Sequence, residues 1–304
     1  MVSVIIPAFN EEEVIEKTAE TIGLILKDAE IRYELIFVDD GSKDKTWEII
    51  SGLSAQNPRI KGVKFSRNFG KEAAIMAGLS ESKGDCSVVI DCDLQHPPEK
   101  IVEMYRLWEE GYEIIEGVKS DRGAESAGYS FGAKLFYSLI SKASHVDLED
   151  TSDFKLLDIK AVLTLINMRE RNAFFRAMTS WIGFKTTKVE FEVMPRVAGE
   201  TKWNKFSLIK YAISNVSSFT TAPMQIVTFL GLITLIISVI LGVESLALKI
   251  MGQALEGFTT EILLQLITSS IVMISLGVIG YYISRIYEEI KGRPKYIISE
   301  KTDA

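Results

Sequence analysis

Several kinds of residue are scarce in this chain, and each shortage argues against a class of function. The 304 residues include two cysteines, Cys86 and Cys92, and two histidines, His96 and His145. Two cysteines cannot supply a disulfide framework or a thiolate zinc site, and they suit a reducing, cytosolic setting. Two histidines leave little room for metal or triad chemistry based on imidazole. No GxGxxG or Walker A pattern occurs, which argues against dinucleotide oxidoreductases and P-loop NTPases.

An excess of basic residues is also missing. The chain has 34 Lys and Arg against 41 Asp and Glu, which gives a formal net charge of −7. A nucleic-acid partner would require a basic face that neutralises its phosphates, so we expect no such partner. The opening residues, MVSVIIPAFNEEE, lack the basic segment of a secretory signal.

Two long runs in the C-terminal third of the chain contain no charged residue. The first extends from Tyr211 to Val243 and the second from Ile262 to Ser284. Twenty helical residues at about 1.5 Å each reach roughly 30 Å, the thickness of the hydrocarbon core of a bilayer. One such run could be a buried core helix, but two in succession favour transmembrane helices. We place these helices at about 222–243 and 262–284.

The charges that flank the two runs predict an orientation. Basic residues precede the first run and follow the second, whereas the connecting loop has one lysine and three glutamates. The positive-inside rule then puts both termini in the cytoplasm, in a multi-pass protein of the inner (plasma) membrane. Apolar residues recur at helical spacing over 204–219, which favours an amphipathic helix on the membrane over a helix packed on the globular part. The predicted division is a cytosolic domain over 1–203, this juxtamembrane helix over 204–219, a membrane region over 220–287 and a cytosolic tail over 288–304.

Apolar runs alternate with helical patterns over the first hundred residues. The strand-like runs are 2–9, 33–42, 60–68 and 86–95, and the helical patterns are 11–29, 44–56 and 71–82. This alternation predicts an α/β fold with a mostly parallel, Rossmann-like sheet covered by helices. Ligands of such sheets bind beyond the carboxyl ends of the strands. Polar residues follow each run, at 7–10, 39–40, 66–68 and 91–95, so we expect them to line one cleft.

The pair Asp91 and Asp93 carries the clearest chemical signal. Both follow a wholly apolar strand, and where the strand unwinds both carboxylates can turn toward one cation. Hard oxygen ligands suit Mg²⁺ or Mn²⁺, with diphosphate oxygens and water completing the coordination. An isolated D-x-D is more often a solvated turn, but here Gln95 and two prolines follow, which favours a metal site.

Seven stretches in register resemble a known family. PAFNEEE, VDDGSKDKT, SRNFGKEAAIMAGL and IDCDLQHPPE look like the family 2 glycosyltransferases, which have the GT-A fold. TSDFKLLD, RNAFFRAMTSWIGF and RVAGETKW, ahead of the predicted spans, are similar to the polyprenyl-phosphate glycosyltransferases, the group of bactoprenol glucosyltransferases and dolichyl-phosphate mannose synthases. The resemblance covers essentially the whole chain.

The resemblance implies roles for individual residues. The residues implied to bind the nucleotide sugar are Pro7, Phe9, Glu11, Asp39, Asp91, Cys92, Asp93 and Gln95. The implied metal ligands are Asp91, Asp93 and Gln95, and the implied catalytic residues are Asp153 and Asp93. The basic residues expected at the acceptor phosphate are Lys119, Arg122, Arg196 and Lys202. Cys92, His96 and Lys119 stand where relatives commonly carry Ala, Asp and Arg.

Three assignments leave alternatives open. Lys71 is placed with the donor-binding residues, although it fits a solvated turn equally well. His96, beside two prolines, fits a loop residue better than a ligand. Asp153 fits either a helix cap or a catalytic carboxylate, and the pattern D-F-K-L-L-D favours the second.

The predicted function is metal-dependent, inverting transfer of a sugar from a nucleotide diphosphate sugar to a polyprenyl phosphate, such as undecaprenyl phosphate. UDP-glucose is the default donor, and the resemblance implies a homo-oligomer, for which we expect a tetramer. The acceptor phosphate is already anionic at neutral pH, so it requires little general-base help. A processive polysaccharide synthase of the same fold is the alternative enzyme, but its Q-x-x-R-W motif and additional spans are missing. A catalytically dead membrane scaffold is the other alternative, against which the intact carboxylates argue.

Overall fold

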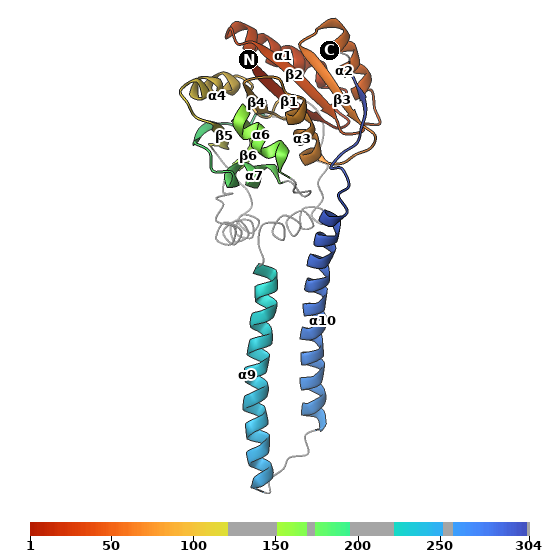
Figure 1. Ribbon diagram of the computed structural model, residues 1–304, viewed down its shortest axis with the longest axis vertical. Coiled ribbons are helices and arrows are strands. Elements are labelled where there is room, and N and C mark those ends of the chain that lie inside the picture. The colour runs from red at the N-terminus through yellow and green to blue at the C-terminus, as the bar shows by residue number, and fades with distance from the viewer. Residues whose placement is uncertain (121–150, 169–173, 195–221, 252–257, 303–304) are drawn as a thin grey trace. The chain divides into compact units, whose positions relative to one another are not determined.

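The computed structural model divides the chain into two compact units. It describes residues 1–120, 151–168, 174–194, 222–251 and 258–302. The larger unit comprises residues 1–204 and 294–304, and the smaller comprises residues 205–293. The larger unit holds a sheet covered by helices, and the smaller holds two long helices (Figure 1).

The larger unit is built on one mixed sheet. Among the described residues its strands are β1 (Val2–Ala8), β2 (Tyr33–Asp39), β3 (Ile60–Phe65), β4 (Cys86–Val89), β5 (Ile114–Lys119), β6 (Thr151–Asp158), β7 (Thr186–Phe191) and β8 (Ile298–Lys301). Their order is β7-β5-β6-β4-β1-β2-β3-β8. Strands β4, β1, β2 and β3 are parallel, whereas β6 and β8 run against their neighbours. The predicted α/β class with a mostly parallel sheet is confirmed.

Helices cover both faces of this sheet (Figure 1). Its helices are α1 (Ile15–Asp28), α2 (Thr46–Gln56), α3 (Lys71–Glu81), α4 (Lys100–Glu109), α6 (Ile159–Asn167) and α7 (Phe175–Trp181). Helices α1, α2 and α4 contribute to the main apolar cluster on one face, and α3, α6 and α7 contact one another on the other. The central strand β1 is apolar on both sides because both faces are covered. Gly78 lets α3 approach β1 closely, since an added Cβ would lie 2.2 Å from Ile5 Cγ2.

The strand order brings the predicted polar ends to one edge of the sheet. The parallel strands β1 to β4 end there, and the order reverses between β1 and β4, which is where ligands of open α/β sheets bind. Strand β6 is antiparallel to β4 and pairs Lys155 with Val89, so its first residues lie at that same edge. Continuing this register by two residues places Asp153 opposite Asp91. Strand β5 also ends there, because Val118 pairs with Thr151.

The C-terminal tail supplies the last strand of the sheet. Strand β8 pairs with β3, and Thr302 receives an N–H bond from Gly62 at its hydroxyl (2.8 Å) while donating its own N–H to the Gly62 carbonyl (3.0 Å). The ring of Tyr296 stacks on Phe65 with centroids 5.0 Å apart. The sequence analysis assigned no element to this tail, because four strand residues are too few to show a pattern.

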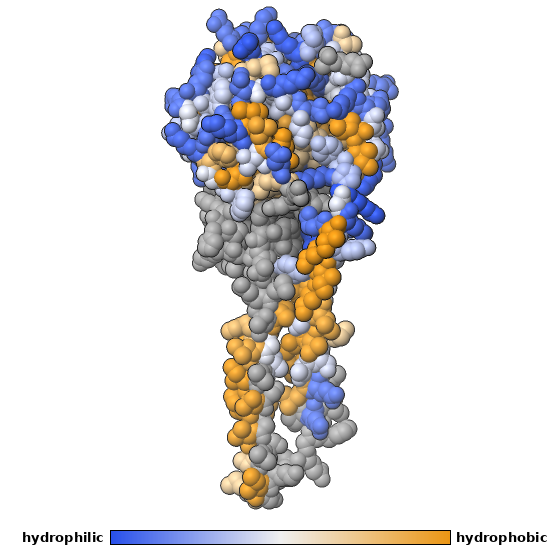
Figure 2. Space-filling view, viewed as in Figure 1, coloured by the Kyte–Doolittle hydropathy of each residue, from blue (hydrophilic) through white to orange (hydrophobic). Residues whose placement is uncertain are grey.

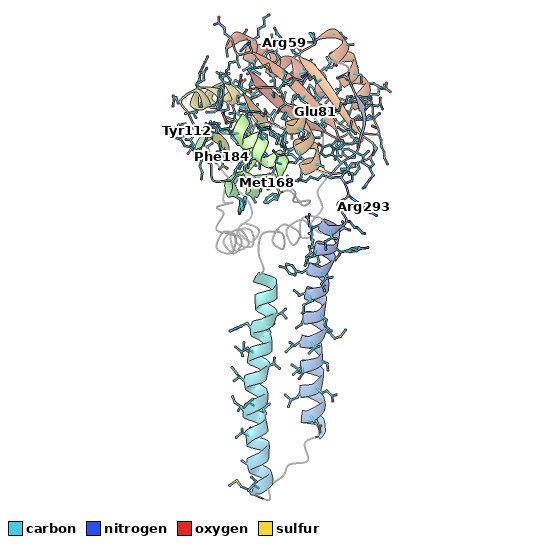
Figure 3. The ribbon with its side chains drawn as sticks, in the orientation of Figure 1. Arg59, Glu81, Tyr112, Met168, Phe184 and Arg293 are labelled. Carbon is cyan, nitrogen blue, oxygen red and sulfur yellow. The ribbon has the colours of Figure 1, made fainter. Side chains whose placement is uncertain are left out.

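Two lysines fasten the tail to helices of the larger unit. Lys295 Nζ donates to the carbonyl oxygen of Met168, just after α6 (3.1 Å). Lys301 Nζ pairs with Glu81 at the end of α3 (2.7 Å). Met168 and Glu81 are both labelled in Figure 3. The tail is therefore held by side chains from two helices as well as by its strand partner.

The described part of the smaller unit contains two apolar helices that contact each other, α9 (Ala222–Ile250) and α10 (Phe258–Ile290). Their described apolar side chains are largely exposed (Figure 2). Within the described residues, one stretch, Ile267–Ile290, is long and apolar enough to cross a membrane, on length and composition alone. It overlaps the predicted span 262–284. In α9 the apolar stretch is the shorter Phe229–Leu241, so the span at 222–243 stays a prediction. Residues 204–219 lie outside the described residues.

The tail contacts predict that strand β8 stabilises the sheet. Deleting residues 295–304 removes an aromatic stack and several hydrogen bonds, and we expect a loss of about 3 kcal/mol, or roughly 6–12 °C in the thermal midpoint. Circular dichroism melting of the full and shortened chains measures this shift. The control, Lys301→Met, removes only an exposed ion pair and should shift the midpoint by about 2 °C or less. Equal midpoints for the full and shortened chains contradict the prediction.

Candidate active site

Asp39, the last residue of β2, presents a buried carboxylate with one oxygen unused by the described residues. The side chain has no exposed surface, and Oδ1 accepts the N–H of Ser42 (2.9 Å). No described residue bonds to Oδ2. Burial raises the pKa of Asp39 above its usual value, and the Ser42 hydrogen bonds oppose the rise. A ligand that brings a hydrogen-bond donor to Oδ2 would compensate for the cost of burying this oxygen.

The neighbouring Asp40 stabilises a loop of the backbone. Its two carboxylate oxygens accept the N–H groups of Phe69 (2.6 Å) and Gly70 (2.9 Å), which hold the loop between β3 and α3. Burial raises its pKa to about 6, although both N–H bonds oppose the rise. The turn after Asp40 requires Gly41, because its φ is +71° and a Cβ would lie 2.5 Å from the Arg67 carbonyl carbon. No local sequence pattern indicates this separate role of Asp40.

The loop after β1 is tied to the loop after β2. Asn10 has a positive φ of 55°, accepts the Lys43 N–H at Oδ1 (2.9 Å) and donates its own N–H to Ser42 (2.8 Å). The Glu11 N–H bonds to the hydroxyl of Thr46 (2.9 Å). These bonds fix the segment that contains the predicted donor-site residues Pro7, Phe9 and Glu11, each of which is partly exposed.

Residues 91–96 alternate between accessible and buried side chains. Asp91, Asp93 and Gln95 are partly exposed, whereas Cys92, Leu94 and His96 are buried. The Thr18 hydroxyl anchors the buried side by donating to the Cys92 carbonyl oxygen (2.7 Å), and the Gln95 N–H bonds to Asp93 Oδ1 (3.1 Å). The three predicted metal ligands therefore share the accessible side of one segment. Cys92 faces the core, where burial raises the pKa of its thiol.

His96, on the buried side of residues 91–96, packs against two phenyl rings. It stacks on Phe154 at 5.2 Å between ring centroids and meets the ring of Phe191 edge-on, also at 5.2 Å. Its Nδ1 lies 3.9 Å from Asp91 Oδ2, beyond hydrogen-bond distance, and no described residue bonds to that nitrogen. Burial lowers the pKa of the imidazole, so the ring is neutral at pH 7.

A network of ion pairs joins the two sides of this edge. Lys71, the first residue of α3, lies between Asp91 Oδ1 (2.6 Å) and Asp153 Oδ2 (2.8 Å). Arg176 of α7 bonds to both oxygens of Asp153, through Nε (2.6 Å) and a terminal nitrogen (3.0 Å). Asp153 lies in strand β6, so the interpretation of this residue as a helix cap was wrong. Asp158 caps α6 instead by accepting the Lys160 N–H.

The cations of this network control the charge of Asp153. Its carboxylate is buried, which alone would raise its pKa, but Lys71 and Arg176 hold the pKa of Asp153 well below its usual range. Burial and the negative Asp153 together raise the pKa of the adjacent Glu72 to about 7. Glu72 accepts the N–H of Phe175, the first residue of α7, at 2.9 Å. Lys71 remains a cation, because the two aspartates raise its pKa.

Of the four basic residues predicted at the acceptor phosphate, the structure describes one. Lys119 is exposed at the end of β5, at the same edge as the carboxylates. Arg122, Arg196 and Lys202 lie outside the described residues. In the described part of the chain, no group of three or more His, Cys, Asp or Glu side chains is gathered to hold a metal.

Sequence reasoning missed Arg176 and Glu72. Arg176 falls in the stretch RNAFFRAMTSWIGF, which supported the resemblance but gave no role for its arginines. Glu72 and Phe175 are separated by 103 residues, so no local pattern connects them. A signal was present for Arg176 alone: a cation in the first turn of a helix opposes the helix dipole, so an anionic partner is expected.

The ion pairs of Asp153 predict a test of stability against pH. Asp153→Asn leaves two cations without their shared anion, and we expect a loss of about 2 kcal/mol at pH 7. The depressed pKa of Asp153 stabilises the fold above the unfolded pKa of about 3.9, and this contribution falls as the pH drops below it. The difference between wild type and variant in urea unfolding should therefore shrink below about pH 4. The exposed Asp28→Asn is the control, and equal stability of Asp153→Asn and wild type at pH 7 contradicts the prediction.

Comparisons with known proteins identify the family of this chain. Residues 3–154 match the family described as glycosyl transferase family 2. The chain is 39% identical over 300 residues to an uncharacterized glycosyltransferase of Bacillus subtilis, covering 98% of this chain and 93% of that protein. It is 38% identical over 299 residues to a prophage bactoprenol glucosyl transferase homolog of Escherichia coli K12, covering 98% of both.

A solved structure also aligns with the chain. The glucosyl-3-phosphoglycerate synthase of Mycobacterium tuberculosis, crystallised with Mn²⁺ and UDP-glucose, is 20% identical with a TM-score of 0.48. The alignment covers 70% of this chain and 75% of that one. The family match and the full-length relatives are sufficient for an assignment: this chain belongs to family 2 of the glycosyltransferases and is a glycosyltransferase.

Proposed function

We propose that this enzyme transfers a sugar from a nucleotide diphosphate sugar to a polyprenyl phosphate, with inversion at the anomeric carbon. The product is a polyprenyl monophosphate sugar, and glucose from UDP-glucose is the first donor to test. The name of the Escherichia coli relative, a bactoprenol glucosyl transferase homolog that aligns over 98% of both chains, supports this acceptor and this sugar.

The observation that carries the donor assignment is the unused oxygen of Asp39. It is fully buried at the end of β2, next to β1 and its Pro7–Glu11 segment. A nucleoside offers N–H and O–H donors of the kind that this carboxylate oxygen lacks among the described residues. Strand β4 flanks β1 on the other side, and Asp91 and Asp93 follow its last residue, Val89. A nucleotide with its base at Asp39 and its diphosphate at Asp93 would cross the strand ends at the point where their order reverses.

Asp91, Asp93 and Gln95 fit a divalent cation. They offer hard oxygen atoms from the accessible side of one segment, the ligand type that Mg²⁺ and Mn²⁺ prefer. Two carboxylates and an amide leave positions for diphosphate oxygens and water, as expected where no larger acidic cluster is gathered among the described residues. Such a cation, when bound, neutralises the negative charge that develops on the departing diphosphate.

The protein's own residues then act on the sugar and the acceptor. Asp153 presents a fixed negative charge near the diphosphate site, as positive charge grows at the anomeric carbon. The acceptor phosphate attacks the anomeric carbon from the face opposite the diphosphate, so the sugar–diphosphate bond breaks as the new bond forms. We assign the binding of that phosphate to Lys119 at this edge and to Arg122, Arg196 and Lys202, by charge-assisted hydrogen bonds.

A lipid acceptor requires that the enzyme act at a membrane. The apolar stretch of α10 is a candidate span, and the name of the Escherichia coli relative supports a membrane setting. We extend the proposal to two spans, at about 222–243 and 262–284, with the catalytic unit and both termini in the cytoplasm, and to an amphipathic helix over 204–219. A homotetramer is the proposed assembly.

A transfer assay tests the function. The full chain in membranes receives labelled UDP-glucose, UDP-galactose, UDP-N-acetylglucosamine or GDP-mannose, each with and without undecaprenyl phosphate. We expect one donor, UDP-glucose first, to give a lipid with one sugar and one phosphate by mass spectrometry, and the anomeric configuration to be inverted. Polymer product would favour the processive synthase, and no product with any donor would favour the inactive scaffold.

Metal dependence is tested by binding as well as by turnover. Asp93→Asn removes one anionic ligand, and we expect Mn²⁺ affinity in the presence of UDP to fall about tenfold or more. Electron paramagnetic resonance counts free Mn²⁺, and circular dichroism checks that the variant is folded. Glu99→Gln, an exposed carboxylate nearby in sequence, is the matched control. Full transfer activity in the presence of a chelator overturns the metal assignment.

A further inference from the structure

Two polar contacts join helix α7 to strand β6. Asp153 and Lys155 are two positions apart in β6 and therefore lie on the same face of the strand. Arg176 and Thr179 are three positions apart in α7 and lie on the same side of the helix. Arg176 bonds to Asp153, and Thr179 accepts a hydrogen bond from Lys155 (2.8 Å). The two contacts together set the position of α7 along the strand.

The second contact is buried and independent of ligands. Lys155 has no exposed surface and pairs with Glu116 of β5 as well as with Thr179. A buried ammonium requires such partners, so Lys155 holds Thr179 and β5 in one arrangement. Glu72 adds a third attachment by accepting the Phe175 N–H at the start of α7. Arg176 therefore reaches Asp153 from a helix that is also held at two other points, Phe175 and Thr179.

Every oxygen of Asp153 is engaged by a cation. Oδ1 accepts Arg176 Nε, and Oδ2 accepts both Lys71 and the second nitrogen of Arg176. The charged groups around the carboxylate are Lys71 and Glu72 on α3, Arg176 on α7 and Lys155 on its own strand. A planar guanidinium that grips both oxygens fixes the orientation of a carboxylate in a way that a single ammonium does not.

We propose that Arg176 is a positioning residue of the transfer reaction: its two bonds hold Asp153 as a fixed anion, in one orientation, beside the reacting sugar. This role rests on the proposed function of Asp153 and goes beyond it. Asp153 then acts on the charge that develops at the anomeric carbon and takes no proton from the acceptor. The acceptor phosphate needs no such base, because it carries its nucleophilic oxygen already ionised at neutral pH. Arg176 acts through Asp153 and is not itself a catalytic residue.

Substitution of Arg176 separates orientation from charge. Arg176→Lys keeps the positive charge but loses the bidentate contact with Asp153. We expect kcat to fall about tenfold, while the KM for the nucleotide sugar changes less than about twofold. Arg176→Ala should lower kcat about a hundredfold. Added methylguanidinium should restore part of the activity of Arg176→Ala by refilling the site, an effect that a purely structural role would not produce. Arg106→Ala, which removes an exposed arginine of α4, is the matched control and should keep wild-type kinetics.

The outcomes distinguish this inference from the proposed function. If the wild type makes no polyprenyl sugar, the proposed function is overturned. The role of Arg176 is then tested by the hydrolysis of the donor by water, for which we expect kcat to fall from wild type to Arg176→Lys to Arg176→Ala. Wild-type kcat in Arg176→Lys and Arg176→Ala overturns the inference. A loss of activity without rescue by methylguanidinium, matched by an equal loss of folded protein in circular dichroism, also overturns it.

Discussion

The pairing of Asp153 with two cations is the interaction on which this edge of the enzyme depends. Burying a charged carboxylate without partners would destabilise the fold. Opposite charges within hydrogen-bond distance offset this free-energy cost. Lys71 comes from α3 and Arg176 from α7, so these two helices must lie where their cations reach one carboxylate. Lys71 extends the constraint to Asp91, which links the end of β4 to the start of β6. The geometry of the site is therefore fixed by charge as well as by apolar packing.

Sequence patterns predicted the parts of this site that local order determines. Asp39, Asp91 and Asp93 follow apolar strands, and parallel strands end at one edge, so their gathering could be predicted from hydrophobic runs alone. Asp153 was found through resemblance, because an antiparallel strand that begins at the site leaves no such signal. Arg176 was not predicted at all, since its contact with Asp153 depends on how α7 packs, which periodicity does not reveal.

The alternation of residues 91–96 shows why some departures from a family pattern can be accommodated. The accessible side keeps two carboxylates and an amide, whereas the buried side receives a thiol, a leucine and an imidazole. A carboxylate in place of His96 would lie against the rings of Phe154 and Phe191 and near the negative Asp91. A neutral imidazole can be buried there at lower cost, and its ring packs on both phenyl groups. The substitution therefore suits the packing of this chain.

The tail shows that the sheet unit is not continuous in sequence. Strand β8 lies beyond α10, yet it pairs with β3, and without it β3 would be an edge with free hydrogen-bonding groups. The stack of Tyr296 on Phe65 also connects the tail to Asp40, because Phe65 contacts Phe69, whose N–H is bonded to Asp40. A division of the chain at residue 204 would separate this strand from its sheet. The pair of long helices is thus an insertion within the larger unit, covalently joined to it at both ends. Residues of the C-terminal tail support the loop between β3 and α3, which Asp40 also holds.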